Sequence, residues 1–177
     1  MSNAGHLGKA VLGHRRAYPN GVASPRRSAG ILLYRASGDA PEVLLVHPGG
    51  PFWARKDAGV WSIPKGEYED GDDPLAAALR EFEEETGTAL APGELFELGD
   101  VRQKAGKVVS AWAAEGDLDA DAVRSNTFTM QWPPRSGRFA TFPEVDRAGW
   151  FGIDEAREKL NPAQTEFLDR LLERLPV

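Results

Sequence analysis

Residues 66–88 read GEYEDGDDPLAAALREFEEETGT, and this stretch decides how the rest of the chain is interpreted. Asp72 or Asp73 is suited to cap a helix, Pro74 suits its first turn, and Gly87 suits its C-terminal stop. The pattern therefore predicts a helix over residues 73–85. At about 100° per residue, one arc of this helix is apolar and is expected to pack on a sheet, through Leu75, Ala78, Leu79 and Phe82.

Glutamates crowd the last two turns of the predicted helix. Glu81, Glu84 and Glu85 are spaced i, i+3 and i+4, so they share one face, whereas Glu83 points elsewhere. The helix dipole disfavours negative charge at this end, and each close pair repels by about 0.2–0.5 kcal/mol. Clustered carboxylates are the ligands that Mg²⁺ or Mn²⁺ prefers, and a cation would remove the repulsion. A solvated acidic face is the alternative that the helix alone leaves open.

The spacing on both sides of the helix favours the metal site. Gly66, five residues, Asp72, seven residues and then residues 80–88 resemble the Nudix box, G-x5-E-x7-R-E-U-x-E-E-x-G-U, in which U is apolar. Asp72 departs from the pattern by replacing a glutamate, and Thr88 departs by replacing an apolar residue. The chain is thus identified as a member of the Nudix hydrolase family, over residues 28–172. The matching positions are Gly66, Arg80, Glu81, Phe82, Glu84, Glu85 and Gly87.

The resemblance implies an α/β fold, a Nudix-type α/β/α sandwich with a mixed β-sheet between helices. The sequence itself shows no strict alternation of strands and helices, which also favours a mixed sheet. We expect helices over 154–160 and 162–172, capped by Asp154 and Asn161. Residues 124–145 are polar and interrupted by proline, and we expect a binding loop there. Apolar runs predict strands at 30–34, 43–46, 61–63, 95–103, 108–114 and 148–153.

The composition allows one domain with a real core. The chain has 177 residues, of which 41% are hydrophobic, and it has no cysteine, which excludes disulfides and thiolate metal sites. No apolar run reaches the roughly 18 residues needed to span a bilayer. We therefore expect a cytoplasmic protein with no membrane partner, and its oligomeric state stays open.

The charge of the chain is unevenly placed. Its net charge is −6, yet residues 1–27 carry five basic and no acidic side chains. We expect a flexible basic tail over 1–27 and the Nudix hydrolase domain over 28–177, with a transit peptide or a nucleic-acid contact as alternatives for the tail. The acidic body would repel polyanions unless cations intervene. A small nucleotide, rather than a nucleic acid, is the expected partner.

The resemblance also implies roles for individual residues. Gly66, Glu81, Glu84 and Glu85 are the expected metal site for Mg²⁺, with Mn²⁺ as the other candidate, and Glu81 and Glu84 are expected to be catalytic. Glu81 is one candidate general base. An acidic residue beyond the box is the other, and Glu144 is preferred over Glu115 for it. Two residues are expected to brace the structure, with Arg80 pairing with Asp72 or a glutamate.

Basic and aromatic residues near the box are candidates for contacts with substrate. Lys65 and Arg55 are expected to contact phosphate, and Trp53 to stack on a base. Further basic candidates for phosphate contacts are Lys56, Arg102, Lys104 and Lys107. For each lysine or arginine a solvated surface charge is the alternative. For Trp53, Trp61 and Trp112 the alternative is core packing.

The expected reaction is Mg²⁺-dependent hydrolysis of a diphosphate linkage in a nucleotide-type substrate. Residues 61–66, WSIPKG, look like the entry to the box in diadenosine tetraphosphate hydrolases and in RNA 5′-pyrophosphohydrolases. The spacing to Glu144 and to residues 150–151 also looks like the former, which favours a dinucleoside polyphosphate. The tyrosine that those enzymes place after the box is absent, so a nucleoside triphosphate pyrophosphohydrolase is the second candidate. A Nudix-like sensor that binds nucleotides without cleaving them is the rival from another class.

Overall fold

The computed structural model describes residues 24–91 and 93–176, so most of the expected tail lies outside the described residues. None of the helices in the described part is long and apolar enough to cross a membrane. The helices are α1 (Pro74–Thr86), α2 (Ile153–Lys159) and α3 (Thr165–Arg174), with short 3-10 turns η1 (Ala120–Ala122) and η2 (Pro162–Gln164). The strands are β1 (Arg27–Ser37), β2 (Ala40–Pro48), β3 (Lys65–Glu67), β4 (Leu95–Arg102), β5 (Val108–Glu115), β6 (Thr127–Gln131), β7 (Phe139–Pro143) and β8 (Val145–Gly152).

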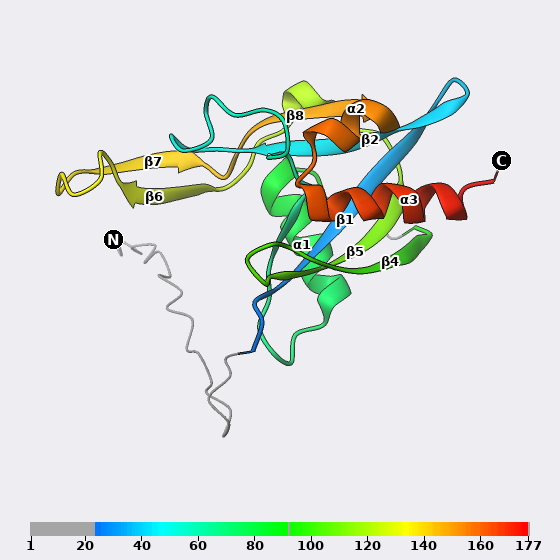
Figure 1. Ribbon diagram of the computed structural model, residues 1–177, viewed down its shortest axis with the longest axis horizontal. Helices are drawn as coiled ribbons and strands as arrows, with labels where there is room; N and C mark the ends of the chain where they lie inside the picture. Colours follow the sequence, from blue (N-terminus) through cyan, green and yellow to red (C-terminus); the bar gives the residue numbers. More distant parts are fainter. Residues whose placement is uncertain (1–23, 92, 177) are drawn as a thin grey trace, which may run out of the picture.

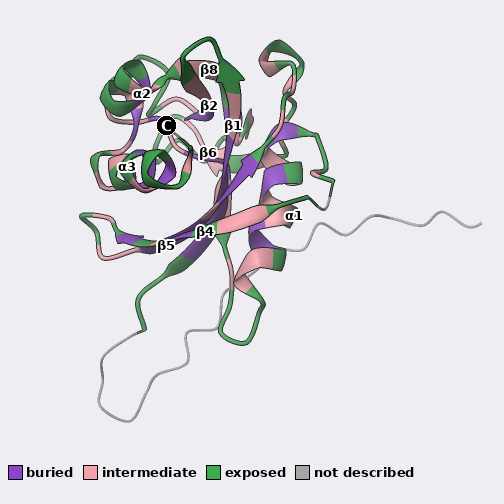
Figure 2. Cartoon of the chain, turned by 90° about the vertical axis from the view of Figure 1, so that its right-hand side faces the viewer, coloured by how far each residue is buried: buried purple, intermediate pink, exposed green. Residues whose placement is uncertain are grey.

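A mixed sheet forms the centre of the molecule (Figure 1). Its order is β4-β5-β1-β2-β8, and β3 pairs with β1 as a sixth strand. β1 runs parallel to β5, whereas all other pairs in the sheet are antiparallel. Helix α1 covers one face, and α2 and α3 cover the other (Figure 2). The expected α/β/α sandwich with a mixed sheet is confirmed.

Strand β1 shows why both faces of the sheet are covered. Its side chains alternate between the two faces, as the two-residue repeat of a strand requires. Ala29, Ile31 and Leu33 pack toward α1, and Leu32 packs toward α2 and α3. All four are fully buried, which removes their apolar surface from water on either side.

Helix α1 forms as its capping signals predicted. The Asp73 carboxylate accepts hydrogen bonds from the backbone N–H groups of Leu75 and Ala76, and Gly87 ends the helix in a left-handed conformation. Ala78 and Phe82 are buried as expected. Ala77 and Thr86 are buried as well, so the buried arc is wider than the apolar pattern indicated.

A buried glutamine joins the opposite layer to the segment before β3. Gln164 has no exposed surface, and its Oε1 accepts a hydrogen bond from the Ile63 backbone N–H at 3.0 Å. Its Nε2 donates to the Ser62 hydroxyl at 3.0 Å. Residues 61–63 were expected to be a strand, but they form isolated bridges instead, and the strand follows at Lys65–Glu67.

The segment 124–145 differs from the expected loop. It folds into a hairpin of β6 and β7, a two-stranded sheet separate from the main one. Alternation of apolar and polar side chains was present in this segment, since Phe128 and Met130 pair with Phe142 and Ala140 on one face. Prolines at 133 and 134 fall in the turn, where they cost no strand hydrogen bond.

Two residues were predicted to cap the starts of helices, and the structure tests both predictions. Asn161 caps η2 by accepting a hydrogen bond from the Ala163 backbone N–H, as predicted. The expected cap of Asp154 is wrong, because α2 begins at Ile153 after Gly152 and no side chain caps it. Asp154 instead lies in the first turn, where its charge suits the helix dipole.

The anchoring role of α1 can be tested at its largest buried side chain. Phe82→Ala is expected to lower the free energy of unfolding by about 3–5 kcal/mol, because Phe82 is fully buried between helix and sheet. Urea titration followed by circular dichroism measures this. The neighbouring Glu83→Ala, at an exposed position, is expected to change it by no more than about 0.5 kcal/mol. Equal losses in the two variants would contradict the packing described.

Candidate active site

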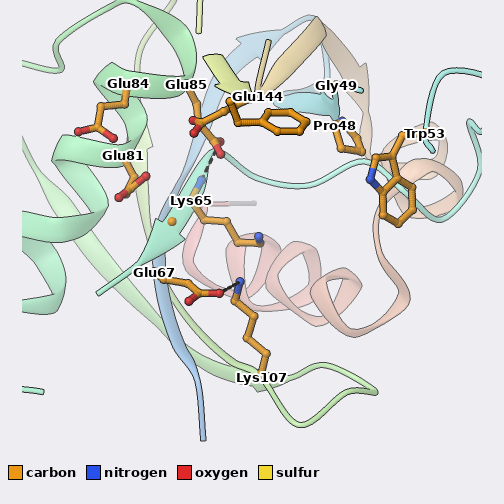
Figure 3. A pocket seen from close by; sticks show the side chains of 12 residues that line it. Pro48, Gly49, Trp53, Lys65, Glu67, Glu81, Glu84, Glu85, Lys107 and Glu144 are labelled. Carbon is orange, nitrogen blue, oxygen red and sulfur yellow. Dashed lines mark hydrogen bonds and ion pairs between the residues drawn. The ribbon is translucent and has the colours of Figure 1, made fainter. Parts of the chain in front are cut away.

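One open cavity of about 480 Å³ collects most of the residues that the sequence singled out. Helix α1, strand β3 and the segment around Glu144 meet there (Figure 3). Four carboxylates lie on one side, Lys65 and Lys107 lie below them, and Trp53 lies at the far end (Figure 3). The lining residues are Pro48, Gly49, Trp53, Lys65, Gly66, Glu67, Glu81, Glu84, Glu85, Lys107, Phe128 and Glu144.

The spacing of the glutamates on α1 brings them to the cavity together. Arg80 contacts two of them, with an Nη2–Oε1 distance of 3.1 Å to Glu81 and an Nε–Oε1 distance of 3.8 Å to Glu84. Half of the Arg80 side chain is exposed, so solvent weakens both ion pairs. Burial and the neighbouring Glu84 raise the pKa of Glu81, while Arg80 opposes this rise.

Glu85 is the most strongly perturbed carboxylate of the group. Its Oε2 accepts a hydrogen bond from the Lys65 backbone N–H at 3.0 Å, which fixes the side chain against β3. Burial, with the charges of Glu81 and Glu144, raises its pKa to about 8, although Lys65 lowers it. A carboxylate in this position gains from a bound cation, since a cation stabilises the charged form.

Glu144 reaches the cavity through a chain of backbone hydrogen bonds. The Asn126 N–H donates to the Glu84 carbonyl at 2.9 Å, and the Glu144 N–H donates to the Asn126 carbonyl at 2.8 Å. The Gly49 N–H then donates to the Glu144 carbonyl at 2.9 Å. Burial, followed by the charges of Glu81 and Glu84, raises the pKa of Glu144. The last turn of α1 and the Glu144 backbone therefore form one connected unit.

Gly66 is required for the close approach of β3 to α1. A Cβ at this position would lie 1.9 Å from Oε2 of Glu81, closer than any real contact. Gly66 pairs with Ala29 in the sheet, so its backbone cannot retreat without breaking that pairing. The glycine of the box thus leaves room for a carboxylate.

Two lysines bring positive charge to the cavity. Burial and the nearby Lys107 lower the pKa of Lys65, and three glutamates partly offset this. Lys107 Nζ lies 3.1 Å from Oε1 of Glu67, which also pairs with Arg26. Because Lys65 and Glu67 are two residues apart on β3, they lie on the same side of the strand. An anion in the cavity would meet Lys65, and it would meet Lys107 together with its partner Glu67.

The remaining candidates from the sequence lie in other places. Arg55 is exposed in the turn after β2 and does not line the cavity. Asp72 accepts a hydrogen bond from the Glu69 backbone N–H at 3.1 Å, while Arg80 pairs with the glutamates named above. Trp61 is buried in the core, and Trp112 packs against the cluster under α1.

Sequence reasoning missed four residues that line the cavity, namely Pro48, Gly49, Glu67 and Phe128. Glu67 lies two residues from Lys65, and the alternation of a strand could have placed it there. Phe128 was hidden because its segment was interpreted as a loop, although its alternation with Met130 was a signal. Lys107 was only one of several basic candidates.

The carboxylates suit a divalent cation by their chemistry rather than by a preformed cage. In the described residues, no three His, Asp or Glu side chains are arranged around a common ion position. Hard oxygen donors are nevertheless the ligands of Mg²⁺ and Mn²⁺, and five glutamates line the cavity, of which Glu67 pairs with Lys107. Burial is the main cause of the raised pKa values of Glu81, Glu85 and Glu144, and the charges of neighbouring glutamates add to it.

The sandwich and its carboxylate-lined cavity define an α/β/α domain built around a candidate cation site. A sequence model of the NUDIX domain matches residues 24–171, which is most of the chain. The chain belongs to the NUDIX family, so the resemblance of the 66–88 stretch is confirmed.

A curated relative and two solved structures illustrate the likeness. An 8-oxo-(d)GTP phosphatase of Mycolicibacterium smegmatis is 28% identical over 159 residues, which are 84% of this chain and 42% of that protein. The chain spans less than half of the length of the curated relatives that it matches first.

Among solved structures, an Ap4A hydrolase of C. elegans has a TM-score of 0.58 at 21% identity, covering 82% of this chain and 96% of that one. The NUDIX domain of Shewanella oneidensis NrtR, complexed with ADP ribose, has a TM-score of 0.60 at 17% identity, covering 90% of this chain and 94% of that one. Likeness at these identities shows the fold.

The raised pKa of Glu85 predicts how pH changes the stability of the protein when a chelator keeps cations away from it. The pKa of Glu85 is about 8 in the folded protein and 4.5 ordinarily. The protonated carboxyl group therefore contributes its full stabilisation of the fold below pH 4.5, and this stabilisation is lost as pH rises through about 8. Glu85→Gln removes this loss of stability, because the glutamine side chain does not ionise. The variant should therefore gain in melting temperature over the unmodified protein as pH increases across that interval.

Differential scanning fluorimetry in a chelator, from acidic to mildly alkaline pH, measures this gap. Glu83→Gln, exposed on the same helix, is the matched control and should follow the unmodified protein at every pH. A gap for Glu85→Gln that does not change with pH would show that ionisation of Glu85 does not oppose folding.

Proposed function

We propose that this protein is a hydrolase that cleaves a phosphoanhydride bond in a nucleotide-type substrate with the help of a divalent cation. The observation that carries the proposal is the cavity that places four carboxylates opposite Lys65 and Lys107. Carboxylates can hold a cation, and lysines can hold the phosphate oxygens, so a polyphosphate fits between them. The similarity to a nucleotide phosphatase supports this choice.

Glu81, Glu84 and Glu85 would hold the cation, Mg²⁺ or Mn²⁺, with Gly66 supplying its backbone beside them. When bound, a cation of this kind neutralises phosphate charge and lowers the pKa of water. Lys65 and Lys107 would then orient the phosphate chain from the other side. A diphosphate resists attack because its charge repels nucleophiles, so positioning and neutralisation are the main requirements.

Glu144 is the proposed general base, with Glu81 as the alternative. Its carboxyl group is half-buried beside the other glutamates, and burial raises its pKa. A raised pKa brings the base closer to the pH at which it must accept a proton from water. Glu144 belongs to a segment between β7 and β8 rather than to α1, so it is free to face a water from another side.

Dinucleoside polyphosphates are the proposed substrate class, and nucleoside triphosphates are the second candidate. The WSIPKG entry to the box supports the first, and the M. smegmatis relative supports the second. Trp53 lines one end of the cavity, where its ring can stack on a base. A cytoplasmic location completes the proposal, because a sequence without cysteine is compatible with a reducing compartment.

Removal of one cation ligand tests the activity. Glu84→Gln is expected to lower turnover by about a hundredfold or more, since it removes a charged ligand while keeping the shape of the side chain. Glu83→Gln, on the exposed face of the same helix, is expected to keep full activity. Equal activity of both variants would contradict the assigned site.

The assay combines a panel of dinucleoside polyphosphates, nucleoside triphosphates and ADP-ribose with Mg²⁺, and identifies products by mass spectrometry in ¹⁸O-labelled water. The labelled product shows which phosphorus is attacked. Tight binding of a panel nucleotide without any turnover would support the non-catalytic sensor instead.

The crowding at Gly66 gives a second test that leaves the core intact. Gly66→Ala is expected to abolish most activity, because the added methyl group would displace the Glu81 carboxylate. The melting temperature should change little, since the atom displaced is the end of a flexible side chain. Gly152→Ala is the control, because a methyl group there meets nothing within 4 Å. Retained activity in Gly66→Ala would remove Glu81 from the proposed mechanism.

A further inference from the structure

Two segments beside the cavity are basic, unlike most of the chain after residue 27. Residues 48–56 and 124–143 together contain five basic side chains and no acidic one, although the net charge of the chain is −6. A local excess of this kind creates a positive field on an otherwise acidic surface. The field adjoins the cavity, because Trp53 and Phe128 from these segments line it.

The two segments are in contact. The rings of Phe52 and Trp132 meet edge to face, with their centroids 5.4 Å apart. Phe128 lies so close to Gly50 that a Cβ there would be 2.9 Å from its ring. The hairpin of β6 and β7 extends away from the body beyond this contact (Figure 1). Residues 52–56 and 132–139 are called the loop–hairpin surface below.

The cations of this surface are not neutralised by the protein. Arg55, Lys56, Arg135 and Arg138 form no ion pair with any carboxylate in the described part of the chain. Lys56 instead places its ammonium group 4.9 Å from the centroid of the Trp53 ring. By contrast, Lys159 and Arg157, on the opposite layer, each pair with an aspartate.

Aromatic rings are exposed on the same surface. Four large hydrophobic side chains are exposed among the described residues. Phe52 at 55% and Trp53 at 40% lie on the loop part of this surface, and Phe139 at 72% lies in the hairpin part but on its other face. Phe139 lies across from Gln131, on the face of the hairpin opposite to Phe128. Exposed rings cost free energy in water, so their concentration beside unpaired cations indicates a ligand.

We propose that the loop–hairpin surface binds single-stranded nucleic acid. Unpaired bases stack on aromatic rings, and phosphates between the bases attract arginine and lysine, which is the combination present here. A second copy that met this chain through the same surface would account for the rings but would bring the free cations of the two copies together. An acidic peptide would account for the cations but would not need several exposed rings.

This inference changes the expectation drawn from net charge, which disfavoured a nucleic-acid partner. Residues 52–56 and 132–139 themselves contain no acidic residue, so a strand that lies on this surface meets the glutamates only where the surface reaches the cavity. Because Trp53 also lines the cavity, a bound strand would present one end to the carboxylates. That last consequence rests on the proposed function, whereas binding to the surface does not.

Fluorescence anisotropy tests the binding in a chelator, so that hydrolysis cannot interfere. The probe is a 3′-labelled oligouridylate of about 12 nucleotides with a 5′-hydroxyl group, and the protein is the full chain. We expect saturable binding that weakens as salt increases. Replacing two cations, in Arg135→Ala/Arg138→Ala, should weaken binding at least about tenfold at low salt and reduce the slope of log Kd against log salt by about 1.4.

Two further variants separate charge from stacking. Phe52→Ala should weaken binding about fivefold or more and leave the salt slope unchanged. Arg157→Ala/Arg174→Ala removes the same charge from α2 and α3 and should change neither quantity. Thermal melting of each variant confirms that it is folded, since every replaced side chain is at least partly exposed.

Several results would overturn the proposal. These are absence of saturable binding, a duplex of equal length that binds as tightly as the single strand, and equal weakening by the control pair. Light scattering that shows a dimer, lost in Phe52→Ala and unaffected by the probe, would assign the rings to a second copy. Hydrolysis of small nucleotides without strand binding would refute this inference alone, and strand binding without any hydrolysis would refute the proposed function alone.

Discussion

Repulsion among the carboxylates of one cavity is the constraint on which the rest of the structure depends. Glu81, Glu84 and Glu85 lie at the end of α1 where the helix dipole disfavours them, and Glu144 adds a fourth charge. The interactions that offset this repulsion lie elsewhere in the molecule. Phe82 anchors the helix in the core under the sheet, and local hydrogen bonds fix the individual side chains.

The site is held together mostly by backbone groups, and this explains how residues far apart in sequence keep a fixed relation. The hydrogen bonds from Asn126 to Glu84, and from Glu144 to Asn126, tie the end of α1 to the segment after β7. On the other side, Gly66 lets β3 approach the helix closely enough to meet Glu81. Side chains therefore vary the charge of the cavity, while the main chain sets its shape.

Local rules were enough to predict α1, its caps and the mixed sheet, because these depend on periodicity and on residues close in sequence. The shared face of Glu81, Glu84 and Glu85 followed from spacing within one helix. Phe128 and Gln164 could not be placed in this way, since their roles depend on contacts between segments far apart in the chain. The hairpin was missed because its prolines suggested a loop, although Pro133 and Pro134 lie in its turn and Pro143 is the last residue of β7. Arg55 was close to the box in sequence but not in space.

The separate two-stranded sheet of β6 and β7 has a consequence for how such a domain diverges. Since this hairpin shares no strand pairing with the main sheet, its length and composition can drift without changing the register of any core strand. At the base of the hairpin, Asn126 is hydrogen-bonded to Glu144, and selection for activity would keep this contact unchanged. The outer half of the hairpin is free to acquire new contacts. Recognition and catalysis can thus be inherited as separable units within a single small domain.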